Sequence, residues 1–152
     1  MIPTIHPRVD ARRGFARQTE SEEHLVAVHV LIVDDHPTFR RAARRVLARL
    51  PGFDVVGEAG TGEQSIQAAR LLRPDLVLMD IHLPDISGLE ASRRILGEAK
   101  ERPVVFLLST YEAAEYASQT AGCGATAYLA KAEFDPATLA AAWASAATAR
   151  AS

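Results

Sequence analysis

Four apolar segments of this sequence lead directly into side chains that could do chemistry together: Asp34 and Asp35, then Asp80, then Ser109, and finally Lys131. Three carboxylates held close together repel one another and raise each other's pKa unless a positive charge lies among them. A hard divalent cation with oxygen ligands and bound water, such as Mg²⁺, would supply that charge. The ammonium and hydroxyl groups would add donors for a tetrahedral oxyanion such as a phosphoryl group. A carboxylate can itself be the nucleophile and become phosphorylated.

The residues around these side chains predict the elements that position them. Short β-branched segments alternate with segments of helical periodicity, separated by Pro, Gly or capping residues. We expect strands over residues 28–33, 53–58, 75–80, 103–108 and 125–129. We expect helices over residues 37–50, 62–72, 89–99, 111–121 and 136–148. Thr61 is expected to cap the second helix and Asp135 the last one.

This alternation of strand and helix predicts the fold class. Five alternations with short connections are typical of a doubly wound α/β domain, in which a five-stranded parallel sheet carries helices on both faces. The crossovers are then expected to be right-handed. Ligands of such sheets bind at the carboxyl ends of the strands. The acidic, hydroxyl and lysine side chains follow different strands, so we expect them to share one edge.

Each of these residues also has a purely structural interpretation. The pairs Asp34-Asp35 and Ser109-Thr110 can act as helix caps, Asp80 can simply end a strand, and Lys131 can lie on the surface. The fold rule places all of them at the same edge independently of one another. This coincidence favours a functional site over four unrelated structural roles.

Composition narrows the class of protein. The chain has 152 residues, of which 48% are hydrophobic and 24% charged, and a net charge of −2. These values indicate one globular domain and argue against disorder or a strongly basic nucleic-acid binder. The single cysteine, Cys123, excludes a disulfide framework, and flanking glycines indicate a small packed residue. No apolar run resembles a membrane span or a signal peptide, so we expect a soluble cytoplasmic protein without membrane contact.

The first 27 residues differ from the rest. Their apolar residues show no period, and we expect residues 1–27 to be a mobile N-terminal extension, with residues 28–149 as the domain. Four arginines of the extension (Arg8, Arg12, Arg13 and Arg17) offer contacts to an acidic partner, although a solvated tail is the simpler interpretation. No pattern of an output domain follows the last helix.

Four segments carry a resemblance to a known family. They are Val30–Pro37, Asp75–Glu90, Val105–Thr110 and Gly122–Lys131. Together they resemble the receiver domain of bacterial two-component response regulators, most closely the receivers of the LuxR/NarL class, which precede a helix-turn-helix domain. The resemblance implies a flavodoxin-like sheet of strand order 2-1-3-4-5 with five helices, the order also found in the chemotaxis regulator.

The resemblance also implies roles at the acidic residues. Asp80 would accept a phosphoryl group from a phosphohistidine of a sensor histidine kinase or phosphotransfer protein. Mg²⁺ would be held by Asp34, Asp35, Asp80 and the backbone carbonyl of His82.

Further roles follow for the other strand ends. Ser109 and Lys131 would bond phosphoryl oxygens, and Tyr128 would be an aromatic switch that turns inward when Ser109 moves. The domain would be regulatory rather than an enzyme, although it takes part in its own phosphorylation and slow dephosphorylation. Its other expected partner is an output protein, or a C-terminal DNA-binding domain if the chain is a piece, and a homodimer would fit.

Three other functions are open to the same residues. One is a degenerate receiver that acts as a phosphorylation-independent interaction module. Another is a phosphatase with a nucleophilic Asp, but such enzymes space two acids by two residues after the first strand, whereas Asp34 and Asp35 are adjacent. A flavodoxin would need a phosphate-binding loop where those two acids stand.

Some positions depart from the family pattern. Lys131 is followed by Ala132, where many receivers have Pro, so the loop that aims the lysine is open to question. His82 and Tyr111 are bulky and are expected to flank the path of the attacking water, where they would tune the phosphoryl lifetime. Trp143 is expected to anchor the core or an interface.

Overall fold

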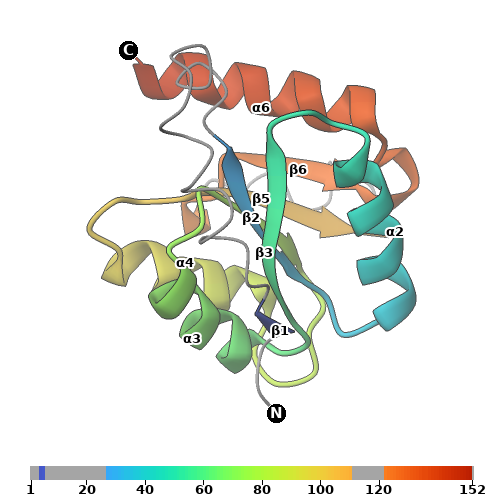
Figure 1. Cartoon of the computed structure of the whole chain (residues 1–152). Coiled ribbons are helices and arrows are strands. Elements are labelled where there is room, and N and C mark those ends of the chain that lie inside the picture. The colour runs from blue at the N-terminus through green and yellow to red at the C-terminus, as the bar shows by residue number, and fades with distance from the viewer. Residues whose placement is uncertain (1–3, 6–26, 111–121, 152) are drawn as a thin grey trace.

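Five parallel strands form the centre of the molecule in the computed structural model, which describes residues 4–5, 27–110 and 122–151 (Figure 1). They are β2 (Val28–Val33), β3 (Phe53–Ala59), β4 (Leu76–Asp80), β5 (Val104–Ser109) and β6 (Ala127–Ala130). Their order in the sheet is β3-β2-β4-β5-β6. In sequence order this is 2-1-3-4-5, which confirms the predicted topology.

The register of the sheet explains why the strand ends meet. Val33 of β2 pairs with Met79 of β4, so Asp34 lies level with Asp80. Asp80 pairs with Leu108, and Ser109 pairs with Ala130. Each functional side chain therefore lies within one residue of its neighbour's level at the same edge.

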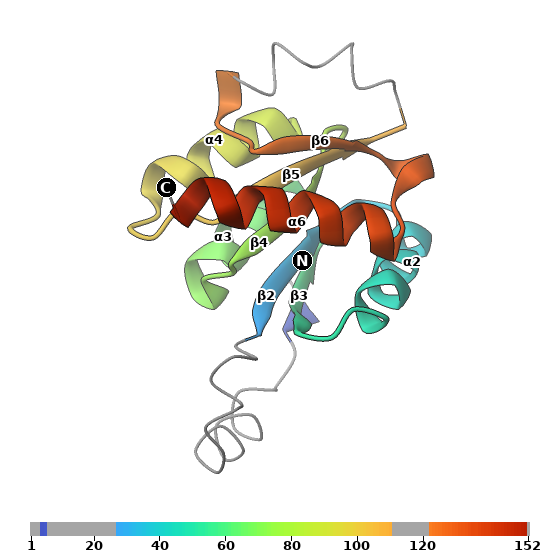
Figure 2. The same ribbon diagram turned by 90° about the horizontal axis from the view of Figure 1, so that it is seen from above.

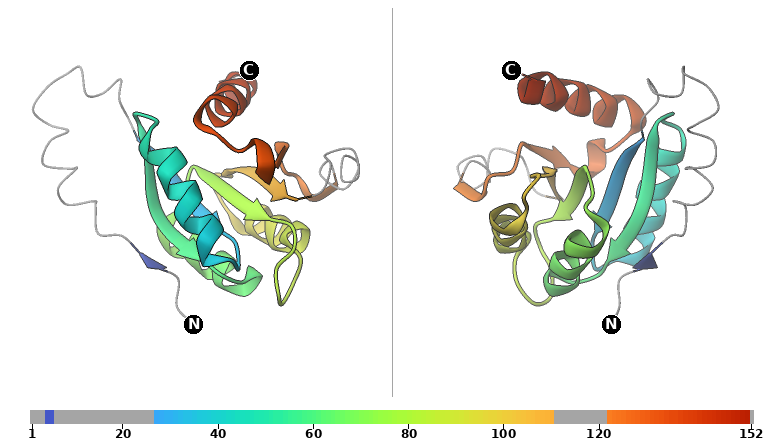
Figure 3. Two further views of the ribbon diagram at one scale, coloured as in Figure 1. Left: turned by 90° about the vertical axis from the view of Figure 1, so that its right-hand side faces the viewer. Right: turned by 60° about the vertical axis from the view of Figure 1, so that its left-hand side comes forward.

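Four α-helices are present among the described residues, two on each face of the sheet (Figures 2 and 3). Helices α2 (Pro37–Ala48) and α6 (Pro136–Ala151) cover one face, where Leu47 and Leu139 are fully buried. Helices α3 (Gly62–Leu72) and α4 (Gly88–Glu98) cover the other face through Ile66 and Ile95. Five helices were expected, and the missing one, over residues 111–121, lies outside the described residues.

The helix starts follow local capping chemistry. The Thr61 hydroxyl accepts a hydrogen bond from the Gln64 N–H at 3.0 Å, and the Asp135 carboxylate accepts one from the Thr138 N–H at 2.8 Å. Both predicted caps are confirmed. Helix α2 ends at Ala48, two residues earlier than predicted, because the chain turns through Gly52 at a φ of +88° to enter β3.

Trp143 and Cys123 both pack in the core, as the sequence predicted. Trp143 packs on the α2 and α6 side and meets the Phe53 ring edge-on at 6.0 Å between centroids. Cys123 is buried in the core beneath α3 and α4.

A sixth strand, β1 (Thr4–Ile5), pairs antiparallel with β3 at the edge of the sheet (Figure 1). The sequence pattern did not predict it, because a two-residue strand pairs through its backbone and needs no apolar periodicity. The rest of the expected mobile extension, residues 1–3 and 6–26, lies outside the described residues. Within the part of the chain that is described, no helix has the length and apolarity of a membrane span.

Candidate functional site

The carboxyl edge of the sheet carries a cluster of acids. Asp34 and Asp80 are buried, and Asp35 is partly exposed beside them. Each of these residues, and His36, offers one ligand atom, and the four atoms lie within 4.8 Å of one another. The three acids were predicted to meet. His36 was not predicted to join them, although its position directly after the acid pair was a signal in the sequence.

Lys131 places its charge inside this cluster. Its Nζ lies 2.5 Å from Asp34 Oδ2 and 3.5 Å from Asp80 Oδ2. The lysine side chain is 14% exposed, so water screens these contacts weakly. The ammonium therefore offsets part of the repulsion among the acids, and it does so mainly at Asp34.

Asp80 is the acid whose protonation is most perturbed. Burial raises its pKa, the charge of Asp34 raises it further, and the result is a pKa of about 6. Lys131 and a hydrogen bond from the His82 N–H to Oδ1, at 3.2 Å, act in the opposite direction. With this pKa, Asp80 is mostly ionised at neutral pH. An additional cation beside it would stabilise the carboxylate and lower its pKa.

The donor set fits Mg²⁺. Asp34 Oδ2 and Asp35 Oδ1 are buried, and their contacts among the described residues are ion pairs, with Lys131 Nζ at 2.5 Å and His36 Nδ1 at 3.1 Å. Neither oxygen accepts any other hydrogen bond from the described residues. Buried carboxylate oxygens with unused lone pairs are what a hard cation coordinates.

An arginine on α2 holds the backbone at Asp34. Arg40 Nη1 donates to the Asp34 carbonyl at 2.5 Å, and its Nε donates to Glu58 at 2.9 Å. Glu58, on the neighbouring strand β3, also forms an ion pair with Arg44. The loop after β2 is therefore tied to β3, which limits how far Asp34 can move.

A residue of the loop after β4 caps the N-terminus of α3. Asp85 accepts hydrogen bonds from the Gly62 N–H at 2.8 Å and the Glu63 N–H at 2.9 Å. Desolvation raises the pKa of Asp85, but the backbone donors of Glu63, Gly62 and Ile86 together outweigh it and lower the pKa. Asp85 thus acts as a second cap for α3, supplied from a residue distant in sequence.

Replacing Asp85 by alanine is expected to lower the free energy of unfolding by about 1 kcal/mol at pH 7, the usual size of a capping interaction. Because the folded-state pKa is depressed, this contribution is present above the unfolded pKa and is lost as the pH falls through the folded pKa. Urea unfolding at pH 7 and at pH 3 measures both values. An equal difference between parent and Asp85→Ala at the two pH values would contradict the capping role.

The remaining predicted residues lie at or near the same edge. Ser109 ends β5 and is fully buried, whereas Thr110 is exposed. Tyr128, on β6, is half-buried and packs against the core beneath α3 and α4. Their switch roles stay predictions, as does the metal contact of the His82 carbonyl. Tyr111 lies outside the described residues.

The loop that carries Lys131 needs no cis peptide bond. None of the described peptide bonds is cis. Lys131 instead begins a single 3₁₀ turn, η3 (Lys131–Glu133), which closes with a hydrogen bond from the Phe134 N–H to the Lys131 carbonyl at 3.2 Å. The turn directs the lysine toward the acids even though Ala132 follows it.

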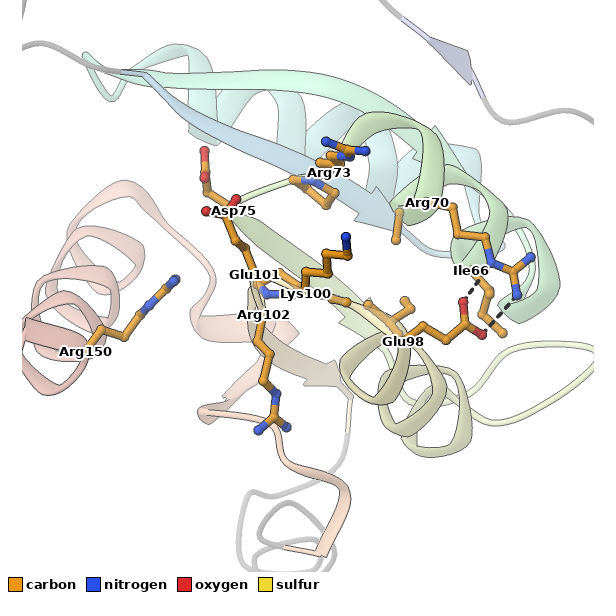
Figure 4. A pocket seen from close by; sticks show the side chains of 14 residues that line it. Ile66, Arg70, Arg73, Asp75, Glu98, Lys100, Glu101, Arg102 and Arg150 are labelled. Carbon is orange, nitrogen blue, oxygen red and sulfur yellow. Dashed lines mark hydrogen bonds and ion pairs between the residues drawn. The ribbon is translucent and has the colours of Figure 1, made fainter.

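A cleft of about 800 Å³ lies at the opposite edge of the sheet, where β4 and β5 begin (Figure 4). Both basic and acidic side chains line it, and Arg70 and Glu98 form a two-bond ion pair there, at 2.7 and 2.9 Å. Asp75, also at the cleft, accepts a hydrogen bond from the His29 N–H at 2.8 Å. The length of the strands separates this cleft from the acid cluster.

Strand order and acidic edge together define a doubly wound α/β domain of the CheY-like kind. The chain belongs to the response regulator receiver domain family, whose model matches residues 30–144.

Relatives and solved structures agree with this assignment. The response regulator GacA of Pseudomonas viridiflava is 40% identical over 104 residues, which are 68% of this chain and 48% of GacA. The chain therefore spans about half the length of the curated relatives it matches. The receiver domain of a putative NarL regulator from Mycobacterium tuberculosis superposes with a TM-score of 0.69 at 27% identity, covering 77% of this chain and 97% of that one. A LuxR-family regulator from Aurantimonas sp. SI85-9A1 gives 0.68 at 32% identity, covering 75% and 80%.

Proposed function

We propose that this receiver domain is switched by phosphorylation of Asp80, with a phosphohistidine of a sensor kinase or phosphotransfer protein as the donor. The observation that carries the proposal is the position of Lys131, whose ammonium contacts the carboxylates of both Asp34 and Asp80. A lysine buried between two carboxylates can exchange one of them for a phosphoryl oxygen over a short distance.

The reaction uses the Asp80 carboxylate as nucleophile. Its oxygen forms a bond to phosphorus while the phosphorus–nitrogen bond to the donor histidine breaks, and the electron pair leaves with the imidazole. Asp34, Asp35 and Asp80 would hold Mg²⁺, together with the His82 carbonyl. When bound, the cation would neutralise charge on the phosphoryl oxygens. Lys131 and Ser109 would bond two of those oxygens.

Phosphorylation would then act as a local charge event. It adds about −1.5 to −2 charge and three acceptor oxygens at Asp80. Lys131 would leave Asp34 for the new oxygens, and the ends of β5 and β6 would rearrange around Ser109 and Tyr128. The changed surface would bind an output partner, a DNA-binding domain in a longer chain, or a second copy of this chain, in the cytoplasm.

The alternative, a module that works without phosphorylation, has less support. All the residues that the chemistry needs are present at one edge. Burial first, and then the Asp34 charge, raise the pKa of Asp80, and a purely structural edge would have no need to keep a carboxylate in such a place.

The test is the intact mass of the chain after incubation with Mg²⁺ and acetyl phosphate. We expect one added phosphoryl group on the parent and none on the Asp80→Asn chain. Asp75→Asn is the matched control, because Asp75 lies just before the same strand and accepts a backbone hydrogen bond that an amide can also accept. We expect it to be phosphorylated like the parent. An unmodified parent, repeated with candidate kinases and short reaction times, would favour the module instead.

A further inference from the structure

An aromatic ring also contacts the ammonium of Lys131. The Nζ atom lies 4.6 Å from the centroid of the Phe39 ring, in the first turn of α2. The same Nζ contacts Asp34 and Asp80. Helix α2, the residue after β2 and the last residue of β4 therefore converge on one ammonium, and the latter two contribute negative charge. Because the lysine side chain is 14% exposed, its contact with the ring face is partly desolvated, and the attraction lies between the exposed and the fully desolvated ends of its range.

The ring is itself fixed by a second ring from the lysine's own loop. Phe134 follows η3 and packs against Phe39 with 5.8 Å between centroids and an angle of 47° between planes. Both rings are partly buried on the core side shared by α2 and α6. The aromatic pair therefore docks the loop after β6 onto the helix after β2, and Lys131 begins the turn that precedes this contact.

We propose that Phe39 is a positioning residue for Lys131, with Phe134 as its support. This role rests on the proposed transfer of a phosphoryl group to Asp80. When that group arrives, Lys131 has to give up Asp34 while staying beside Asp80. The carboxylate contacts change in this step, whereas the ring face can keep hold of the ammonium throughout. An aliphatic side chain at position 39 would fill space but would offer no negative face.

The first test measures the rate constant of phosphorylation by acetyl phosphate. We expect Phe39→Leu to lower it about fivefold, the size expected for a partly desolvated cation–π contact. Phe39→Tyr keeps the ring face and should restore the rate to within about twofold of the parent. Phe53→Leu is the matched control, because Phe53 is a half-buried member of another aromatic pair, next to Trp143, and has no cation in the described structure. It should keep the parent rate.

A second test needs no phosphorylation and keeps the inference separate from the proposed function. Unfolding in urea of Phe39→Leu, Lys131→Met and the double variant, all metal-free, measures the coupling between ring and ammonium. We expect the two substitutions to be non-additive by about fivefold in the unfolding equilibrium constant. Circular dichroism of each variant establishes that it folds before its values are used.

The outcomes are distinct. A parent rate for Phe39→Leu, an equal loss in Phe53→Leu, or additive unfolding data would overturn the positioning role. A parent chain that is never phosphorylated would overturn the proposed function, and with it any role of Phe39 in transfer. The coupling would then describe a structural contact only.

Discussion

The Asp80→Asn chain is expected to be more stable than the parent by about 2 kcal/mol at pH 7 when both are metal-free. Burial and the nearby Asp34 charge raise the Asp80 pKa to about 6 in the folded state. A shift of about two units from the unfolded value corresponds to about 3 kcal/mol. The attraction of Lys131 is already included in this net shift, and the cost of burying the asparagine amide offsets part of the gain. Removing a charge at the candidate site should therefore strengthen the fold.

The same shift predicts how the difference depends on pH. An acid with a raised folded pKa is protonated more readily in the folded state, so its unfavourable effect is absent below the unfolded pKa of about 4. That effect grows as the pH rises through the folded pKa and is complete somewhat above 6. The stability difference between the two chains should therefore be large at pH 7 and small at pH 4. Comparing the chains at each pH cancels the titration of groups that they share.

Urea unfolding in the presence of EDTA measures this difference, and Asp75→Asn is the control. Adding Mg²⁺ at pH 7 should stabilise the parent and close most of the gap, because the cation relieves the repulsion that asparagine removes. An Asp80→Asn chain less stable than the parent at pH 7, without metal, would contradict the unfavourable burial and repulsion that we infer for the Asp80 carboxylate.

Replacing Gly88 by alanine is the second change with a large expected effect. A Cβ atom at Gly88 would lie 2.0 Å from the Asp80 carbonyl oxygen and 2.9 Å from its carbonyl carbon. These are backbone atoms of a central strand, which cannot move aside as a flexible side chain could. We expect the free energy of unfolding to fall by about 3 kcal/mol, the upper range of overpacking.

Gly97 offers a matched control on the same helix, α4. A Cβ there would meet nothing within 4 Å, and the residue is exposed. Gly97→Ala should leave stability unchanged or raise it by about 0.5–1 kcal/mol, because alanine favours helix more than glycine does. Urea unfolding of both variants tests the contrast. Equal stabilities for the two alanine variants would mean that the α4 start is not held tightly against Asp80.

Gly88 also links fold to chemistry. Its N–H donates to the Ile81 carbonyl at 2.8 Å, directly after Asp80. If the Gly88→Ala chain folds by shifting α4 outward, Asp80 should shift as well. We therefore expect its phosphorylation by acetyl phosphate to be slower than that of the Gly97→Ala chain.

The local elements could be predicted from the sequence because each has a local cause. The apolar segment before Asp80 is nearly continuous, as a strand buried on both faces requires, and the capping role of Thr61 depends only on neighbours three residues away. The meeting of Asp34, Asp80 and Lys131 also followed, because parallel strands end at one edge.

Other features depend on how the loops run in space. The pairing of β1 with β3 uses backbone groups that every residue has, so no side-chain pattern predicts it. His36 joins the acid cluster because the turn after β2 points its ring toward Asp34 and Asp35. Such contacts form between groups whose approach is decided by turn geometry rather than by residue type.

The sequence by itself determined the α/β class, the strand order implied by its family resemblance, and which acids stand at the carboxyl edge. These features could be predicted because the periodicity of a segment and the end of a strand depend on residues that are consecutive in the chain. Only the tertiary structure decided that Lys131 lies closer to Asp34 than to Asp80, that the Phe39 ring lies against its ammonium with Phe134 packed on that ring, and that Gly88 touches the Asp80 backbone. These distances arise from packing between segments far apart in the chain, where differences of an ångström decide which partner a charge meets.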